Sequence, residues 1–242
     1  MYIIDMPKKS KTPTILKVKD ELPNEKFDDI HENLPQMPSL CLIIGSVRSG
    51  KSNLLVNFFC NDEFYKDKFD TVKIVSTTLH TDNKGKILDK HFDCIDHYED
   101  QIIEDIKKSQ GQFDKSDRPT YALVMDDVLT KDFSKNNAVS FFSTRFRHYI
   151  DFYIIAVQSF RAVSGMIRNN ATNIIVCRLQ NAKEREKVAE EYSPMVGGED
   201  NFNMLYDKIH SKPFQYMVID LQSNPARVLH NFDEVLWQGQ QQ

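Results

Sequence analysis

Short apolar runs alternate with amphipathic segments along most of this 242-residue chain. Leu40–Ile44, Tyr121–Met125 and Phe152–Val157 are apolar at every position, which indicates strands that are covered on both faces of a sheet. Less regular runs predict further strands at Val72–Ser76, Phe92–Ile95, Asn173–Leu179 and Phe214–Leu221. Apolar residues at helical spacing predict the helices Lys51–Phe59, Glu99–Lys108, Phe133–His148, Ala182–Tyr192 and Asn201–His210.

Strands that alternate with helices are typical of parallel βαβ units. Because the strands are apolar throughout, both faces of the sheet should be covered. The expected fold class is therefore α/β, with a central, mostly parallel sheet and helices on both faces. The sequence contains no internal repeat.

The first 38 residues differ from the rest of the chain, since they contain five of its nine prolines. One extended-favouring segment there, Thr14–Val18, predicts a strand. We expect residues 1–38 to form an arm that wraps the following domain or a neighbouring subunit, with a tail that makes no contacts as the alternative. Residues 39–237 should form one domain, and residues 238–242 a polar tail.

Composition restricts the possible partners and the cellular compartment. Hydrophobic residues make up 40% of the chain and charged residues 27%, with a net charge of -4, so any polyanion site has to be a local patch. No apolar run approaches the roughly 20 residues of a membrane-spanning helix, and no signal peptide is visible. The cysteines lack zinc-binding spacing, which favours free thiols in a soluble intracellular protein with no direct membrane insertion. They are Cys41, Cys60, Cys94 and Cys177.

One segment matches the phosphate-binding pattern G-x-x-x-x-G-K-[ST] in full, between a predicted strand and a predicted helix. Its glycines allow backbone N–H groups to point at phosphate oxygens, and the helix N-terminus adds partial positive charge. Lys51 would reach the β- and γ-phosphates of ATP, and the Ser52 hydroxyl would ligate Mg²⁺. The residues predicted to hold the nucleotide are Gly45, Ser46, Val47, Arg48, Ser49, Gly50, Lys51, Ser52 and Asn53.

A second acidic motif follows the apolar run that begins at Tyr121. Asp126 is predicted to hold Mg²⁺, and Asp127 to orient or deprotonate the attacking water. A helix cap or a turn is the structural alternative for Asp127. Two predicted strands lie between the phosphate loop and Asp126. An inserted strand and a second acid indicate the RecA-like (ASCE) division of P-loop NTPases, which includes helicases and translocases, and argue against a small-molecule kinase.

Two further polar groups are candidates for catalysis. Gln158 ends the predicted strand Phe152–Val157, where it would lie beside the γ-phosphate and sense hydrolysis; a strand-end hydrogen bond is the alternative. A ring ATPase also needs an arginine from the neighbouring subunit to neutralise transition-state charge. Arg147 is the first choice and Arg145 the second, with solvated surface arginines as the alternative.

Together these motifs resemble the FtsK/HerA superfamily of P-loop ATPases. The resemblance covers about residues 39–180 and includes Arg147-His148, the strand that ends in Gln158, and the segment Ile167–Ile175. The short length and the Asp126-Asp127 pair look most like the viral branch, the poxvirus-type genome-packaging ATPases of large DNA viruses and virophages. Two positions depart from the wider group. Asp127 stands where that group usually has Glu as the catalytic acid, and Ser159 follows Gln158 where its bacterial members tend to have Arg-Pro.

The resemblance implies a homo-oligomeric ring that hydrolyses ATP with Mg²⁺ and drives double-stranded DNA into a preformed capsid. It also implies capsid or vertex proteins as partners, and a location in the virion or in the cytoplasm of the infected cell. Candidate DNA contacts are the Lys84, Lys86 and Lys90 group and the Arg161 and Arg168 pair. For each of them a solvated face is the more common alternative.

Two other functions remain open at this stage. A P-loop kinase or transferase would need an acceptor-binding region, for which residues 80–118 are the one candidate. A non-hydrolysing scaffold that assembles on ATP would need the nucleotide site but no turnover.

Overall fold

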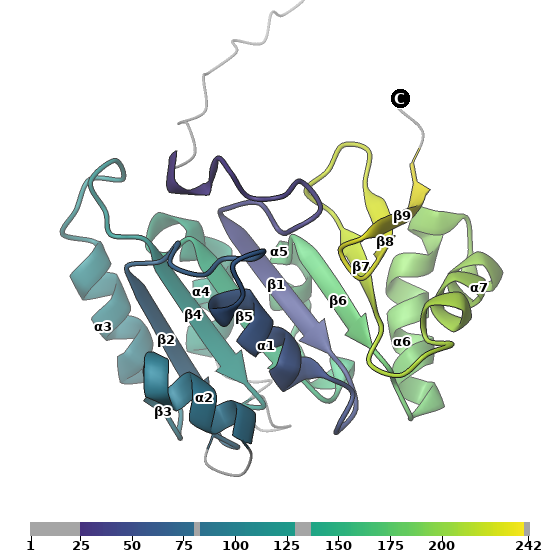
Figure 1. Cartoon of the computed structure of the whole chain (residues 1–242), viewed down its shortest axis with the longest axis horizontal. Coiled ribbons are helices and arrows are strands. Elements are labelled where there is room, and N and C mark those ends of the chain that lie inside the picture. The colour runs from purple at the N-terminus through teal and green to yellow at the C-terminus, as the bar shows by residue number, and fades with distance from the viewer. Residues whose placement is uncertain (1–24, 80–82, 129–136, 240–242) are drawn as a thin grey trace, which may run out of the picture.

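A computed structural model of the chain describes residues 25–79, 83–128 and 137–239 (Figure 1). Within these ranges one nine-stranded sheet forms the centre of the molecule, in the order β3-β2-β4-β5-β1-β6-β7-β8-β9. The strands are β1 (Ser39–Ile44), β2 (Thr71–Ser76), β3 (Asp93–Ile95), β4 (Tyr121–Asp126), β5 (Phe152–Val157), β6 (Asn173–Cys177), β7 (Tyr216–Asp220), β8 (Arg227–His230) and β9 (Glu234–Gln238).

The sheet is parallel from β3 to β6 and antiparallel from β6 to β9. All parallel strands therefore end at the same edge of the sheet, and the loops that follow them meet there. Strand β5 lies between β1 and β4, so the strand before the phosphate loop is not the neighbour of the strand that ends in Asp126.

Helices cover both faces of the sheet (Figure 1). Residues of α1 and α2 belong to one buried apolar cluster, and residues of the other helices belong to a second cluster on the opposite face. Alternate residues of β1 divide between the two clusters, with Leu40 and Leu42 on one face and Cys41 and Ile43 on the other. The helices are α1 (Lys51–Cys60), α2 (Asn83–His91), α3 (Asp100–Gln110), α4 (Asn137–Arg145), α5 (Gly165–Asn170), α6 (Ala182–Tyr192) and α7 (Glu199–Ile209).

An aromatic cluster fixes α1 on the sheet. Phe58 is completely buried, and its ring lies 5.7 Å from the ring of Phe152 on β5 and 5.6 Å from that of Tyr65. The Tyr65 hydroxyl donates a hydrogen bond of 2.8 Å to the carbonyl of Pro35, which ties the segment before β1 to the same cluster. The start of α1, and with it the phosphate loop, is held in place by these contacts.

These observations confirm the expected α/β fold with a mainly parallel sheet and helices on both faces, and they correct several details. The last part of the sheet is antiparallel, and β8, β9, α2 and α5 were not predicted. The helix expected at Phe133–His148 begins at Asn137 within the described residues and changes to a 3₁₀ turn at Phe146–His148. Gln238, which was expected to begin a polar tail, is the last residue of β9.

The described part of the N-terminal segment lies against the domain. Phe27, Leu34 and Met37 are buried there, and Lys26 pairs with Asp70 at 2.7 Å. The strand expected at Thr14–Val18 lies outside the described residues. The division into an arm and a domain stays a prediction.

Candidate nucleotide site

The loop between β1 and α1 has a backbone conformation that its glycines permit. Gly50 has a φ of 111°, which side chains other than hydrogen rarely allow. A Cβ atom on Gly45 would lie 2.3 Å from Oγ of Ser49 and 2.6 Å from Cβ of Cys177. Both glycines of the phosphate-binding pattern are therefore required by the local geometry.

The segment after β6 holds the outer part of this loop. The backbone N–H of Ser46 donates to the carbonyl of Arg178 at 3.2 Å, and the Ser46 hydroxyl accepts from the N–H of Gln180 at 2.8 Å. Within the loop, the N–H of Ser49 donates to the carbonyl of Ser46 at 3.1 Å. These hydrogen bonds hold the loop in a curled conformation, which a phosphate-binding loop requires.

Helix α1 begins directly after Gly50, with Lys51 as its first residue. The first N–H groups of a helix have no acceptor within the helix, and the helix dipole adds partial positive charge at that end. The Lys51 side chain is buried, and its Nζ donates to the carbonyl of Gly45 at 2.9 Å. Lys51 therefore lies across the loop, with its charge at the place where a phosphate group would bind.

Asp126 is the last residue of β4 and is buried. It pairs in register with Ser76 of the neighbouring strand β2, and the Ser76 hydroxyl donates to Oδ2 of Asp126 at 2.9 Å. Asp126, Ser76 and Ser52 line the same small cavity beside the phosphate loop. Hydroxyl and carboxylate oxygens are ligands that Mg²⁺ prefers, so the residues present fit the predicted metal.

Asp127 has a left-handed backbone conformation with a φ of 52°. Its N–H donates to the carbonyl of Ala156 on β5 at 2.9 Å, which turns the side chain towards the phosphate loop. Oδ1 of Asp127 lies 3.9 Å from Nζ of Lys51, and Oδ2 accepts a hydrogen bond of 2.9 Å from Nε2 of Gln158. Residues that follow β1, β4 and β5 thus meet in one polar group at the carboxyl edge of the sheet.

Arg147 lies far from this group. It is in the 3₁₀ turn that precedes β5, whereas Gln158 directly follows β5, and a strand of six residues spans about 20 Å. Arg147 and Arg145 are both exposed at the opposite edge of the sheet from the phosphate loop of their own chain. Neither arginine can reach the nucleotide site of its own subunit, so a role in catalysis requires a neighbouring subunit.

The structure also shows site residues that were not predicted from the sequence. Ser76, at the end of β2, contacts Asp126, and a polar residue at the end of an apolar run was the available signal. Glu184 on α6 is buried and accepts hydrogen bonds from the Ser159 hydroxyl at 2.9 Å and from the N–H of Phe160 at 2.7 Å. Glu184 thereby fixes the segment that follows Gln158, and no local pattern indicated this.

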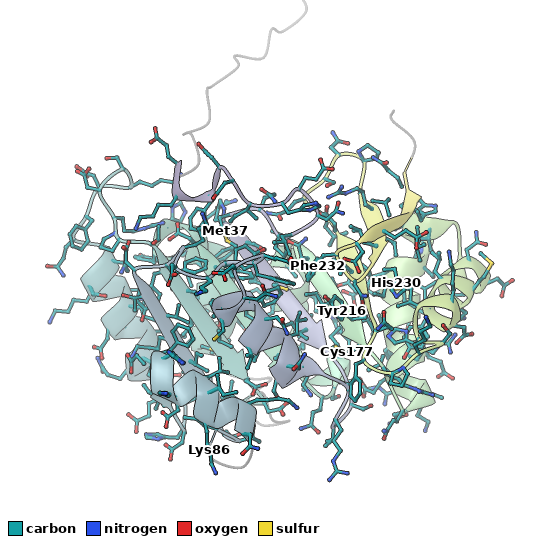
Figure 2. All side chains as sticks on the ribbon, in the orientation of Figure 1. Met37, Lys86, Cys177, Tyr216, His230 and Phe232 are labelled. Carbon is teal, nitrogen blue, oxygen red and sulfur yellow. The ribbon has the colours of Figure 1, made fainter. Side chains whose placement is uncertain are left out.

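The candidate DNA-binding residues differ in their surroundings. Arg168 pairs with Glu191 at 3.1 Å and lies over the ring of Phe160, while Arg161 donates to the carbonyl of Lys183. Lys84, Lys86 and Lys90 are exposed on α2, and Figure 2 shows Lys86 at the outer side of that helix. The α2 lysines are accessible, whereas Arg168 is half-buried and held by contacts within the chain.

Solved structures of similar fold share this architecture. The DNA-packaging ATPase B204 of Sulfolobus turreted icosahedral virus matches with a TM-score of 0.55 and 16% identity over 80% of this chain and 98% of that chain. B204 of Sulfolobus turreted icosahedral virus 2 in complex with AMPPCP matches with a TM-score of 0.52 and 14% identity, over 80% and 98% of the two chains. The cytoplasmic domain of the type VII secretion ATPase EccC of Thermomonospora curvata matches with a TM-score of 0.51 and 13% identity, over 81% of this chain and 24% of that chain.

No protein-family model matches the chain, and no curated protein does. At identities below 20% the structural similarity establishes the fold, which is that of P-loop ATPases. Among the helices in the described ranges, none has both the length and the apolar character that crossing a bilayer requires.

Proposed function

We propose that this protein hydrolyses ATP to ADP and phosphate. The observation that supports this most directly is the group formed by Lys51, Asp127 and Gln158 beside a complete phosphate loop. Asp127 orients the attacking water or accepts its proton, and Gln158 holds the carboxylate in position. Lys51 neutralises charge on the β- and γ-phosphates, and the N–H groups of the loop bind the remaining phosphate oxygens.

Mg²⁺ would be held by Ser52 and, through water, by Asp126. The ion supplies charge neutralisation between the β- and γ-phosphates when it is bound. Ser76 keeps one oxygen of Asp126 engaged in a hydrogen bond, which orients the carboxylate towards the cavity that it shares with Ser52.

We further propose that hydrolysis drives the movement of double-stranded DNA into a viral capsid. The similar fold of the DNA-packaging ATPase B204, which this chain covers over 98% of its length, supports this proposal. Helix α2 contributes Gly85 and Leu88 to the cavity that Ser52 and Asp126 line, and it carries the accessible lysines on its exposed side, so DNA bound to this helix would be close to the nucleotide. Contacts of this kind bind the phosphate backbone without regard to sequence.

The first test is ATP hydrolysis with and without long double-stranded DNA at low salt. We expect DNA to raise the rate several-fold in the natural protein and to leave Lys51→Ala inactive. Lys66→Ala is a suitable control, because Lys66 is an exposed lysine paired only with Asp62 among the described contacts. A Lys51-dependent rate that ignores DNA would retain the ATPase and contradict the translocase.

We also propose that the protein acts as a homo-oligomeric ring, in which Arg147 of one subunit reaches the nucleotide site of its neighbour, and this proposal has its own test. Subunits with Arg147→Ala should bind ATP but lose turnover, and so should subunits with Asp127→Asn. A mixture of the two should regain activity, because some interfaces then combine an intact acid with an intact arginine. Absence of recovery at every mixing ratio would refute Arg147 as the arginine supplied in trans, and the same mixture with Arg145→Ala examines the second choice.

A further inference from the structure

A cavity of about 200 Å³ opens beside the phosphate loop, on the side away from Asp127. It is bounded by Ser49 and Gly50 of the loop and by the first turns of α1, and on its other side by β6 and the segment that leads into β7. The polar and aromatic side chains that line it come from Asn53, Asn57, Phe64, Cys177, Phe214 and Tyr216. The residues that line this cavity do not include Lys51, Asp127 or Gln158.

The strand order fixes the direction in which a nucleotide would lie. Asp127 and Gln158 follow β4 and β5, on one side of β1, and they mark where the γ-phosphate would be. Strands β6 and β7 lie on the other side of β1. A nucleotide whose γ-phosphate faces Asp127 must therefore extend its ribose and base towards β6 and β7, where the cavity is.

Phe214 is the most unusual residue of this cavity. Its side chain is 68% exposed, although the ring lies so close to the loop that a Cβ on Gly50 would be 3.7 Å from its Cδ1 atom. Its φ is 60°, a conformation that is an outlier for a bulky residue. An exposed aromatic ring on a strained backbone indicates a constraint other than packing of the core.

The other side of the cavity is closed by apolar groups. Cys177 and Tyr216 are paired in register on β6 and β7, and Figure 2 shows their side chains near each other beside α1. Burial raises the pKa of the Cys177 thiol to about 12, so the thiol is neutral and unreactive. Asn53 and Asn57 add amide groups along the α1 side.

We infer that this cavity binds the base of the nucleotide, with the ring of Phe214 stacked on a purine. The assignment rests on the proposed nucleotide site and adds a base-binding part to it. An aromatic ring stacks on any base, while the larger face of a purine gains more contact than a pyrimidine. The exposed amide of Asn53 lines the cavity and is placed to hydrogen-bond the edge of the base, whereas the amide of Asn57 already donates to the carbonyl of Asn53 and accepts from Asn61.

The test compares binding of Mg-ATP with binding of inorganic triphosphate, which has no base, by titration calorimetry. Phe214→Ala should weaken ATP binding roughly tenfold or more and leave triphosphate binding unchanged. Phe214→Tyr, which retains a stacking ring, should bind ATP like the natural protein. Phe113→Ala serves as the matched control, because Phe113 is also an exposed phenylalanine (47%) but lies in the connection before β4.

Phe214→Gly separates base binding from folding. Glycine tolerates a φ of 60°, so the variant should be as stable as the natural protein without nucleotide, or more stable, while its ATP affinity falls like that of Phe214→Ala. Unchanged ATP affinity in both variants would overturn the base site. Unchanged triphosphate affinity in Lys51→Ala would instead overturn the phosphate site, so the two failures can be told apart.

Discussion

Nε2 of Gln158 donates a hydrogen bond of 2.9 Å to Oδ2 of Asp127, and the other oxygen of that carboxylate lies 3.9 Å from Nζ of Lys51. The carboxylate is thus held from both sides, although Asp127 itself is in a loop. A charged group that is held by an amide on one side and an ammonium on the other is oriented before substrate binds. This relationship makes the effect of Gln158 on catalysis an indirect one, through the position of Asp127.

Gln158→Ala should therefore lower kcat roughly tenfold or more while ATP affinity changes little, since the amide contacts the carboxylate and not the phosphate loop. Gln158→Glu places a second carboxylate beside Asp127 and should lower kcat further, because the two like charges repel. Steady-state kinetics and equilibrium ATP binding give the two quantities. A large loss of affinity with unchanged kcat would show that Gln158 binds nucleotide instead.

Asp127→Asn should lower kcat by roughly a hundredfold or more, because an amide cannot accept the proton of the attacking water. Asn adopts the left-handed region more readily than most residues, so the φ of 52° and the stability of the fold should be retained. Asp127→Ala should lose the same activity and also about 1 kcal/mol of unfolding free energy. Chemical unfolding of both variants separates the catalytic role from the backbone role, and equal stability would contradict the latter.

The parts of the site that were predicted share one property: each can be recognised from a short stretch of sequence. The phosphate loop needs its glycines within six residues, and Asp127 and Gln158 each end an apolar run. Parallel strands then bring their carboxyl ends together, so the meeting of these side chains followed from the fold class. Their predicted roles in catalysis remain to be measured.

The remaining features depend on pairings between distant segments. Ser76 contacts Asp126 only because β2 and β4 are in that register, and Phe214 meets Gly50 only because β7 returns antiparallel beside β6. Helix α2 was missed because its buried side consists of Gly85 and Leu88, which gives no apolar face that a pattern could reveal. Strand β9 was missed because it is largely exposed.

Gly45→Ala tests how closely the loop is packed. The new methyl group would lie 2.3 Å from Oγ of Ser49 and 2.6 Å from Cβ of Cys177, so one of these neighbours has to move. We expect a loss of about 1–3 kcal/mol in unfolding free energy, as for other overpacked sites, and a strong loss of ATP binding. Gly165→Ala is the matched control, because its methyl group would meet only Arg168, at 3.9 Å. Equal stability and affinity of Gly45→Ala and the natural protein would show that the loop adjusts freely.

His210 links the end of α7 to the strand that supports the phosphate loop, and we expect it to make stability depend on pH. Its Nδ1 lies 2.8 Å from the carbonyl of Tyr206 and its Nε2 3.1 Å from that of Val176. Burial lowers the pKa of His210, and the nearby Arg178 and Arg185 lower it further, although the two carbonyls act in the opposite direction.

Below the ordinary histidine pKa of about 6.5 the unfolded chain binds the proton more readily than the folded one. The contribution of His210 is therefore present at pH 7.5 and is lost as the pH falls from about 6.5 towards the lower pKa of the folded state. Chemical unfolding at pH 7.5 and pH 5.5 should show a smaller decrease in stability for His210→Gln, whose side chain does not titrate, than for the natural protein. His148→Gln is the control, because His148 is exposed in the 3₁₀ turn before β5. Equal decreases in His210→Gln and the natural protein would show that His210 is not the group whose titration lowers the stability.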